Sequence, residues 1–239
     1  MSLEGNIVVV VGGSSGIGLA SAKAAAAKGA RVVLGGRSEE RLEAAREAIG
    51  PQAQAHALDI TDPASIDRFF DAAGPLDHLV ITAAGASLGR FLDIDIVAAR
   101  RFFDSKFWGP YAVARRAAPQ IRPAGSITFF SGAAGSRASP GFSCGSAINA
   151  AVEALGHTLA VELAPIRVNT VSPGLVDTPV WDSIVSRAER DALFDETATQ
   201  LPAGRIGRPE EIADAVLFLI RNAYTTGTTL FVDGGYRHM

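Results

Sequence analysis

Short apolar runs alternate with longer helical segments along this chain. Most of the short runs are continuously apolar, which is typical of parallel strands that helices cover on both faces. The runs of strand length are residues 7–11, 31–34, 55–59, 78–82, 126–131, 167–171 and 229–232. The segments with a helical pattern are residues 17–28, 39–49, 63–73, 95–120, 145–163 and 210–221.

This alternation predicts an α/β protein with a single doubly wound, Rossmann-like domain. Crossovers between parallel strands are right-handed, so a seven-stranded parallel sheet with helices on both faces is expected. No repeat, low-complexity tract or linker divides residues 1–239, which therefore form one domain. The least regular stretch is 179–207, which we interpret as a loop-rich substrate lid. The alternative is an ordinary helical excursion.

Composition narrows the range of partners. The chain has 239 residues and a formal net charge of only −3, which argues against nucleic acid or an anionic membrane as the main partner. Cys144 is the only cysteine, so no internal disulfide can form, and His56 and His78 show no metal-ligand spacing. No apolar run approaches membrane-spanning length and no secretory leader is recognisable. We expect a soluble, cytoplasmic protein with no metal.

A glycine-rich turn joins the first predicted strand to the first predicted helix. Residues 11–18 read Val-Gly-Gly-Ser-Ser-Gly-Ile-Gly. Gly12 permits a tight turn, Gly16 lets the backbone approach a phosphate, and Gly18 allows the helix to pack closely on the strand. The amino-terminus of the helix offers unpaired N–H groups to an anion. This context predicts a dinucleotide pyrophosphate site that includes Gly12, Ser14, Ser15, Gly16, Ile17 and Gly18.

The end of the second predicted strand indicates which nucleotide binds. An acidic residue here would bond both ribose hydroxyls of NAD. The segment is instead Leu-Gly-Gly-Arg-Ser at residues 34–38. Gly36 leaves room for a 2′-phosphate, Arg37 can grip it with a forked, charge-assisted bond, and Ser38 can donate a further bond. We therefore predict NADP(H) in preference to NAD(H).

With these residues, the chain resembles a short-chain dehydrogenase/reductase over nearly its whole length. Residues 11–18 are similar to the family's Thr-Gly-x-x-x-Gly-x-Gly, with Val11 in place of threonine. The resemblance implies that Leu58-Asp59-Ile60 brackets the adenine, that Thr82-Ala83-Ala84-Gly85 replaces the usual Asn-Asn-Ala-Gly, and that the segment 172–178 orients the nicotinamide carboxamide. The cofactor residues that it implies are Asp59, Ile60, Ala83, Ala84, Gly85, Pro173, Gly174, Val176 and Thr178.

The resemblance also implies an active site of Asn, Ser, Tyr and Lys, the last two spaced Tyr-x-x-x-Lys. In the family, tyrosine exchanges the proton and lysine lowers the tyrosine pKa. A gapless alignment over residues 125–163 and the upstream segment gives a different residue at each position. Lys106 stands for asparagine, Gly132 for serine, Gly145 for tyrosine and Asn149 for lysine. No tyrosine anywhere in the chain precedes a lysine by four positions.

Substitutes for the missing groups are limited. We hypothesise that the Lys106 side chain places an ammonium group in the pocket, where it bonds the ribose or a substrate oxygen. The alternative is that Lys106 lies in a helix interface or a groove and takes no part in the chemistry. Ser131, Ser143 and Ser146 are weaker candidates for substrate contact, since serine before a helix is commonly a cap. Ser143 also lies in a Gly-x-Ser-x-Gly motif, but a loop precedes it where a hydrolase elbow needs a strand.

The sequence therefore favours an atypical NADP(H)-dependent oxidoreductase that acts on a carbonyl, alcohol or quinone-type substrate. The alternative is a catalytically silent NADP(H)-binding sensor or regulatory protein. Apolar and small residues on more than one face of the segments 95–120 and 145–163 favour a homodimer or homotetramer, as is common in the family. The identity of the substrate cannot be deduced from these residues.

Overall fold

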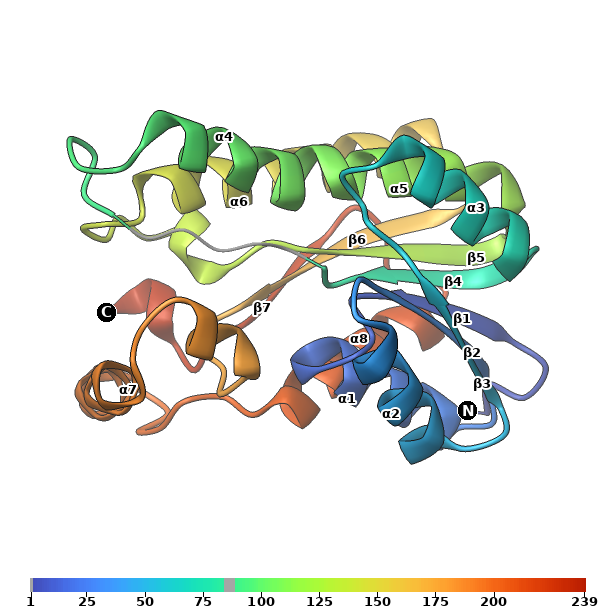
Figure 1. The fold of residues 1–239 in the computed structure, drawn as a ribbon, viewed down its shortest axis with the longest axis horizontal. Helices are drawn as coiled ribbons and strands as arrows, with labels where there is room; N and C mark the ends of the chain where they lie inside the picture. Colours follow the sequence, from blue (N-terminus) through green and yellow to red (C-terminus); the bar gives the residue numbers. More distant parts are fainter. Residues whose placement is uncertain (1, 84–88) are drawn as a thin grey trace.

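The computed structural model describes residues 2–83 and 89–239. It confirms a single α/β domain with one seven-stranded parallel sheet, in the order β3-β2-β1-β4-β5-β6-β7 (Figure 1). The strands are β1 Ile7–Val11, β2 Arg31–Gly36, β3 Ala53–Ala57, β4 Leu76–Ile81, β5 Ile121–Phe130, β6 Arg167–Pro173 and β7 Thr229–Val232. The α-helices are α1 Gly16–Ala26, α2 Glu39–Ile49, α3 Pro63–Ala73, α4 Ile96–Phe103, α5 Gly109–Ala117, α6 Ser143–Glu162, α7 Arg187–Gln200 and α8 Pro209–Arg221.

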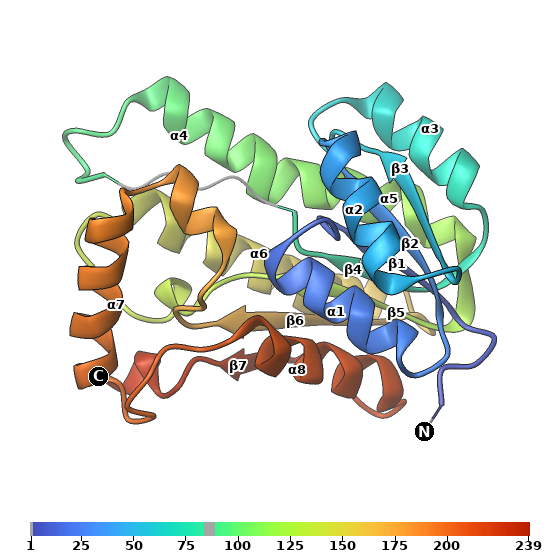
Figure 2. The ribbon, with the colours of Figure 1, turned by 60° about the horizontal axis from the view of Figure 1, so that its bottom comes forward.

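Two layers of helices enclose the sheet. The helices α3, α4, α5 and α6 lie on one face, and α1, α2 and α8 lie on the other (Figure 1). Figure 2 shows α1 and α8 side by side along the sheet, with α7 at the end away from the N-terminus. The strand order changes direction between β1 and β4, and in open α/β sheets such a switch point is where ligands bind, beyond the carboxyl ends of the strands.

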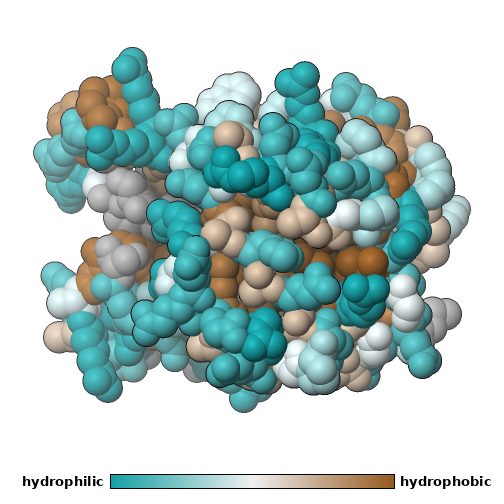
Figure 3. Space-filling view, turned by 45° about the vertical axis from the view of Figure 1, so that its right-hand side comes forward, coloured by the Kyte–Doolittle hydropathy of each residue, from teal (hydrophilic) through white to brown (hydrophobic). Residues whose placement is uncertain are grey.

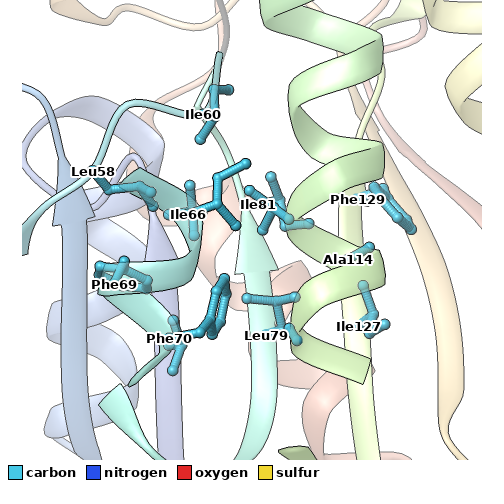
Figure 4. Close-up of a cluster of buried hydrophobic side chains, with 14 of the residues drawn as sticks. Leu58, Ile60, Ile66, Phe69, Phe70, Leu79, Ile81, Ala114, Ile127 and Phe129 are labelled. Atoms are coloured by element: carbon cyan, nitrogen blue, oxygen red, sulfur yellow. The ribbon is translucent and has the colours of Figure 1, made fainter. Parts of the chain in front are cut away.

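The core explains why these runs form buried strands. Val9, Val10 and Val11 of β1 have no exposed surface, because helices cover both faces of this central strand. On the α3 and α5 side, phenylalanine and aliphatic side chains fill the space between helices and sheet (Figure 4). Phe69 and Phe70 pack edge to face, with ring centroids 5.1 Å apart. Burial of such side chains stabilises the fold by about 1.5–3 kcal/mol each.

A histidine is buried within the sheet. His78 of β4 is only 5% exposed, and its Nδ1 lies 2.9 Å from Ser126 Oγ on the neighbouring strand. Burial lowers the pKa of His78 to about 4; the positive charge of Arg167 acts in the same direction, and Asp77 opposes it. The ring is therefore neutral near pH 7, and His78 packs as part of the sheet interior.

The predicted helix over residues 95–120 is wrong in detail, because the structure breaks it. A turn of π-helix, η1 (Asp104–Trp108), separates α4 from α5, and a short 3-10 turn, η2 (Ala118–Gln120), follows α5. Pro110 gives a physical reason for the wide turn. Proline has no N–H to donate to the carbonyl four residues earlier, and its ring crowds that carbonyl, which here belongs to Lys106. The break therefore falls at the residue that the sequence singled out.

The prediction that 179–207 is loop-rich is also wrong. The segment contains the short 3-10 helix η4 (Pro179–Ser183) and then α7. A capping box starts α7: the Glu189 N–H donates to Ser186 Oγ, and the Ser186 N–H donates to Glu189 Oε2. This Ser-x-x-Glu pattern is a helix-start signal that could have been read from the sequence. The segment is therefore largely helical, and its role as a substrate lid remains a prediction.

Candidate active site

A cleft of about 1120 Å³ lies at the carboxyl ends of the strands. Hydrophilic side chains cover most of the face seen in Figure 3, and apolar residues show in a band across its middle. The predicted cofactor residues that line the cleft are Gly12, Ser14, Ser15, Gly16, Ile17, Gly18, Gly36, Arg37, Asp59, Ile60, Ala83, Pro173, Gly174 and Thr178. The four residues that the sequence alignment assigned to the tetrad positions, Lys106, Gly132, Gly145 and Asn149, line the same cleft.

The other predicted cofactor residues lie elsewhere. Ser38 is the N-cap of α2, where its Oγ accepts a hydrogen bond from the Arg41 N–H at 3.3 Å. Val176 is 5% exposed and packs in the apolar core on the α8 side. Ala84 and Gly85 fall outside the described residues.

We call the part of the cleft formed by the β1-α1-β2 crossover the dinucleotide half. Gly12 and Gly16 have φ angles of +87° and +51°, a region that other residues rarely adopt. A Cβ at Gly18 would lie 2.1 Å from the Gly12 carbonyl oxygen, so only glycine allows this close packing of helix on turn. These glycines leave the backbone exposed to a bound anion.

The start of α1 is suited to negative charge. Its N-cap residue, Ser15, makes no side-chain cap, and the first turn holds no acidic residue. The backbone N–H groups and the positive end of the helix dipole are therefore available to a phosphate.

Two arginines line the ribose end of the dinucleotide half. Arg37 was predicted, whereas Arg41, one turn into α2, was missed. The α2 N-cap places Arg41 here, and a Ser-x-x-Arg spacing after the strand could have indicated it. Asp59 lies nearby, and hydrogen bonds from Thr61 lower its pKa, with a smaller contribution from Arg37. Asp59 is therefore an ionised acceptor at the end of β3.

We call the surroundings of Lys106, Gly132, Gly145 and Asn149 the redox half. Lys106 lies in η1, and its Nζ donates a hydrogen bond to the Ser131 carbonyl oxygen at 3.3 Å. Burial lowers the pKa of Lys106 to about 8. Part of the side chain still faces the open cleft, but protein atoms surround the ammonium group closely enough to desolvate it. The Lys106 ammonium can therefore give up its proton more readily than an ordinary lysine.

The side chain of Asn149 packs closely against Gly132. Asn149 is 6% exposed, and its Oδ1 is buried without a hydrogen-bond partner among the described residues. A Cβ at Gly132 would lie 3.0 Å from Asn149 Nδ2, so a serine at 132 would crowd the amide. Since a buried acceptor without a partner is costly, Asn149 Oδ1 is suited to a donor from a bound molecule.

A carboxylate joins the ends of two strands beneath this site. Glu153 Oε1 accepts hydrogen bonds from Ser131 Oγ at 2.7 Å and from Ser172 Oγ at 3.3 Å. Ser131 follows β5 and Ser172 belongs to β6. The Ser131 hydroxyl, one of the weaker sequence candidates, is thus bonded to Glu153, while the carbonyl of the same residue holds Lys106.

The remaining serine candidates lie at the start of α6. Ser143 is the first residue of the helix, and β5 ends well before it, so the strand that a hydrolase elbow requires is absent here. Ser143 and Ser146 line a smaller pocket of about 420 Å³ beside the main cleft. Between them, Cys144 Sγ donates to the Ala99 carbonyl at 3.8 Å, and burial raises the pKa of its thiol.

Tyr236 and Trp181 line the cleft and were missed as site residues. Tyr236 OH lies 3.0 Å from Ser139 Oγ, and the Arg137 guanidinium lies 4.8 Å from the tyrosine ring centre. Trp181 comes from η4. Both residues reach the cleft through tertiary contacts, and no spacing in the sequence signals them.

Comparison with known proteins agrees with this geometry. Residues 11–237 match the family model described as enoyl-(acyl carrier protein) reductase. A short-chain dehydrogenase/reductase of Stachybotrys chlorohalonatus, ATR9, is 34% identical, with 98% of each chain covered. The 3-oxoacyl-[acyl-carrier-protein] reductase FabG of Thermotoga maritima is 33% identical, over 98% of this chain and 99% of that protein.

A solved structure is also similar. It is an NADPH-bound short-chain oxidoreductase from Pseudomonas aeruginosa PAO1, described as containing an atypical catalytic centre. The two sequences are 32% identical, the alignment covers 98% of this chain and 97% of that chain, and the TM-score is 0.91. The chain belongs to the short-chain dehydrogenase/reductase family of oxidoreductases. No helix among the described residues is long and apolar enough to cross a membrane.

Proposed function

We propose that this protein is an atypical NADP(H)-dependent oxidoreductase that acts on a carbonyl, alcohol or quinone-type substrate without the family's usual tetrad. The observation that carries the proposal is the Lys106 ammonium, which lies in the cleft beside the positions that the tetrad would occupy. The residues that line the cleft fit the coenzyme in two places and supply one proton-exchanging group.

The dinucleotide half fits the phosphates of NADP(H). The glycines leave the backbone open at the start of α1, where no side chain caps the helix. Arg37 and Arg41 would hold the 2′-phosphate, and Ser38 can donate its hydroxyl hydrogen while its oxygen caps α2. No acidic residue lies at the end of β2, where NAD-binding proteins use one.

The redox half fits the other end of the coenzyme. Asn149 Oδ1 has no protein partner among the described residues, and a hydroxyl of the nicotinamide ribose would satisfy it. When bound, NADPH supplies a hydride ion to an electrophilic carbon of the substrate.

Lys106 is the proposed proton donor. The ammonium would donate a proton to the substrate oxygen as that oxygen becomes negative, and the neutral amine would recover a proton from water. A carbonyl carbon thus gains hydride, its oxygen gains a proton, and an alcohol results. The Ser131 carbonyl holds the ammonium in place, and Glu153 fixes Ser131. Activated carbonyls and quinones suit this site best, because they demand less assistance from an acid.

Two measurements test the proposal. NADPH binding is measured by the change in coenzyme fluorescence, and NADPH oxidation is then screened against carbonyls, diketones and quinones. Binding together with turnover on at least one acceptor supports an oxidoreductase. Binding without turnover on any acceptor would instead make the protein a silent NADP(H)-binding sensor, and no binding of either coenzyme would contradict both functions.

We also propose a homodimer or homotetramer. Trp108 of η1 is 56% exposed and stacks edge-on with Tyr111 of α5, their centroids 5.8 Å apart, so an aromatic pair faces outward. Aromatic residues are enriched at protein interfaces. Light scattering should show an assembly that Trp108→Ser weakens; a monomer at all protein concentrations would contradict this.

A further inference from the structure

The redox half contains an open space at Gly145 that two aromatic rings border. Among the described residues outside the local helix, a Cβ built at Gly145 would meet Phe102 Cε1 at 3.7 Å and Phe142 Cδ1 at 4.0 Å. Both are ordinary van der Waals distances, so a side chain would have room. Gly18 contrasts with this, because a Cβ there would lie 2.1 Å from a backbone oxygen. Packing does not demand glycine at 145, and the space beside it is available to a ligand.

A third aromatic side chain adds apolar surface to the same cleft. Trp181 lines it from η4, and its Nε1 donates to the Val176 carbonyl oxygen at 2.9 Å. Its ring also packs edge to face on Phe194, with centroids 5.7 Å apart. These contacts fix the indole and occupy its one hydrogen-bond donor. Trp181 therefore contributes flat hydrocarbon surface and offers no polar group to a ligand.

The shape and chemistry of this space favour a flat ring. By the family resemblance, this is the position of the tyrosine, and glycine here leaves that ring out. Aromatic walls bind another ring by stacking or edge contact, in addition to the burial of apolar area. Lys106 supplies one polar donor for an oxygen carried by the ring.

We propose that this protein selects substrates with a planar aromatic or quinonoid ring, which occupies the space at Gly145 against Phe102 and Phe142 and turns a ring oxygen toward Lys106. The inference rests on the proposed function and deepens it by naming the substrate class. In effect, the ring of the substrate replaces the absent tyrosine ring.

Calorimetry on the NADP⁺-loaded full-length chain tests the inference without turnover. The two probes are naphthol and its saturated analogue decahydronaphthol, which share a hydroxyl and a fused two-ring skeleton but differ in flatness. Naphthol should bind at least about tenfold more tightly. Gly145→Leu should fill the space and weaken naphthol by at least about tenfold. Ala147→Leu, which adds the same side chain at an exposed position of the same helix, should have no effect.

The outcomes separate this inference from the proposed function. NADP⁺ affinity is measured first for every protein, and naphthol binding is then compared at NADP⁺ concentrations that saturate each one. Equal affinities for naphthol and decahydronaphthol, or unchanged naphthol binding in Gly145→Leu, would overturn the inference and leave an NADP(H)-dependent oxidoreductase intact. Failure of the unaltered chain to bind NADP⁺ would overturn both.

Discussion

The dinucleotide half and the redox half of the cleft are built from different parts of the chain. The first depends on backbone shape within a single crossover, β1-α1-β2, where glycine angles and an uncapped helix start leave backbone N–H groups open. The second depends on side chains from η1, the end of β5 and α6, which meet only in the folded protein. A site made of backbone tolerates few substitutions, whereas a site made of side chains can exchange its chemistry and keep its place in the fold.

The largest effect that would sharpen this comparison is expected at Lys106. Lys106→Met removes the proposed acid but keeps a long side chain, and the rate of NADPH oxidation should fall about 10²–10⁴-fold. The rate of the unaltered protein should fall as the pH rises above about 8, because the ammonium that donates the proton is lost through its pKa. Steady-state kinetics measured across pH test both statements.

Ser105→Ala, next to Lys106 in the same π turn, is the control and should retain activity. Full turnover in Lys106→Met, or a profile that does not change through pH 8, would show that the redox half acts through another group.

The second effect concerns the dinucleotide half of the cleft. Gly18→Ala places a methyl group 2.1 Å from the Gly12 oxygen. We expect a loss of about 3 kcal/mol in the free energy of unfolding, together with loss of NADPH binding. Gly36→Ala is the matched control, since its Cβ would stand 3.4 Å from Ser14 Oγ and the fold should remain stable. Urea unfolding measures both; equal stability of the two variants would show that the turn relaxes more readily than the structure indicates.

The third effect separates the pH dependence of the reaction rate, which is set in the redox half, from the pH dependence of the free energy of unfolding. The pKa of His78 is about 4 in the folded protein, and its ordinary value is 6.5. As the pH falls, the histidine is therefore protonated in the unfolded chain before it is protonated in the folded protein. Stability from this group is therefore present above pH 6.5 and is lost toward pH 4. Between about pH 7 and about pH 5 we expect a loss of about 2 kcal/mol in the free energy of unfolding.

Urea unfolding of His78→Asn provides the comparison, because asparagine does not titrate. The variant should show a smaller loss over the same pH interval by about the same amount. If the two proteins lose stability in parallel, the histidine is protonated in the folded sheet. The acid effect of His78 and the alkaline effect of Lys106 lie on opposite sides of neutrality, so one pH series distinguishes them.

The smallest effect lies at the ribose end of the dinucleotide half. Arg37→Ala should weaken NADPH binding by about tenfold, because one charged hydrogen bond to the 2′-phosphate is lost. NADH carries no 2′-phosphate, so its affinity should not change. Fluorescence titration of both coenzymes is the measurement. An equal loss for the two coenzymes would mean that Arg37 does not distinguish them.

The same division explains how much could be predicted from the sequence. The strands and the glycine turn were predictable, because burial on both faces and positive φ angles restrict residue type at neighbouring positions. The family resemblance assigned Lys106, Gly132, Gly145 and Asn149 to the tetrad positions, and the structure brings these four residues to one cleft. By contrast, the π turn at Lys106 depends on Pro110 and on packing around it, and the single helix predicted over 95–120 missed it.

Other parts of the site had no local signal. Trp181 reaches the cleft because α7 folds back beside η4, and Tyr236 reaches it from the last residues of the chain. The unpartnered Asn149 Oδ1 can be recognised only when every neighbouring donor is known. Sequence patterns thus predict elements and backbone turns, but they do not give side-chain surroundings assembled from distant elements.

Cys144 has a practical consequence for work on this protein. Its thiol is partly buried at the start of α6, donates to a backbone carbonyl, and has a pKa above its ordinary value. Only the thiolate attacks disulfides or electrophiles, so at neutral pH this sulfur reacts slowly. Purified samples should resist covalent cross-linking in air, and a thiol-directed probe, once coupled at alkaline pH, would mark a single known place in the first turn of α6.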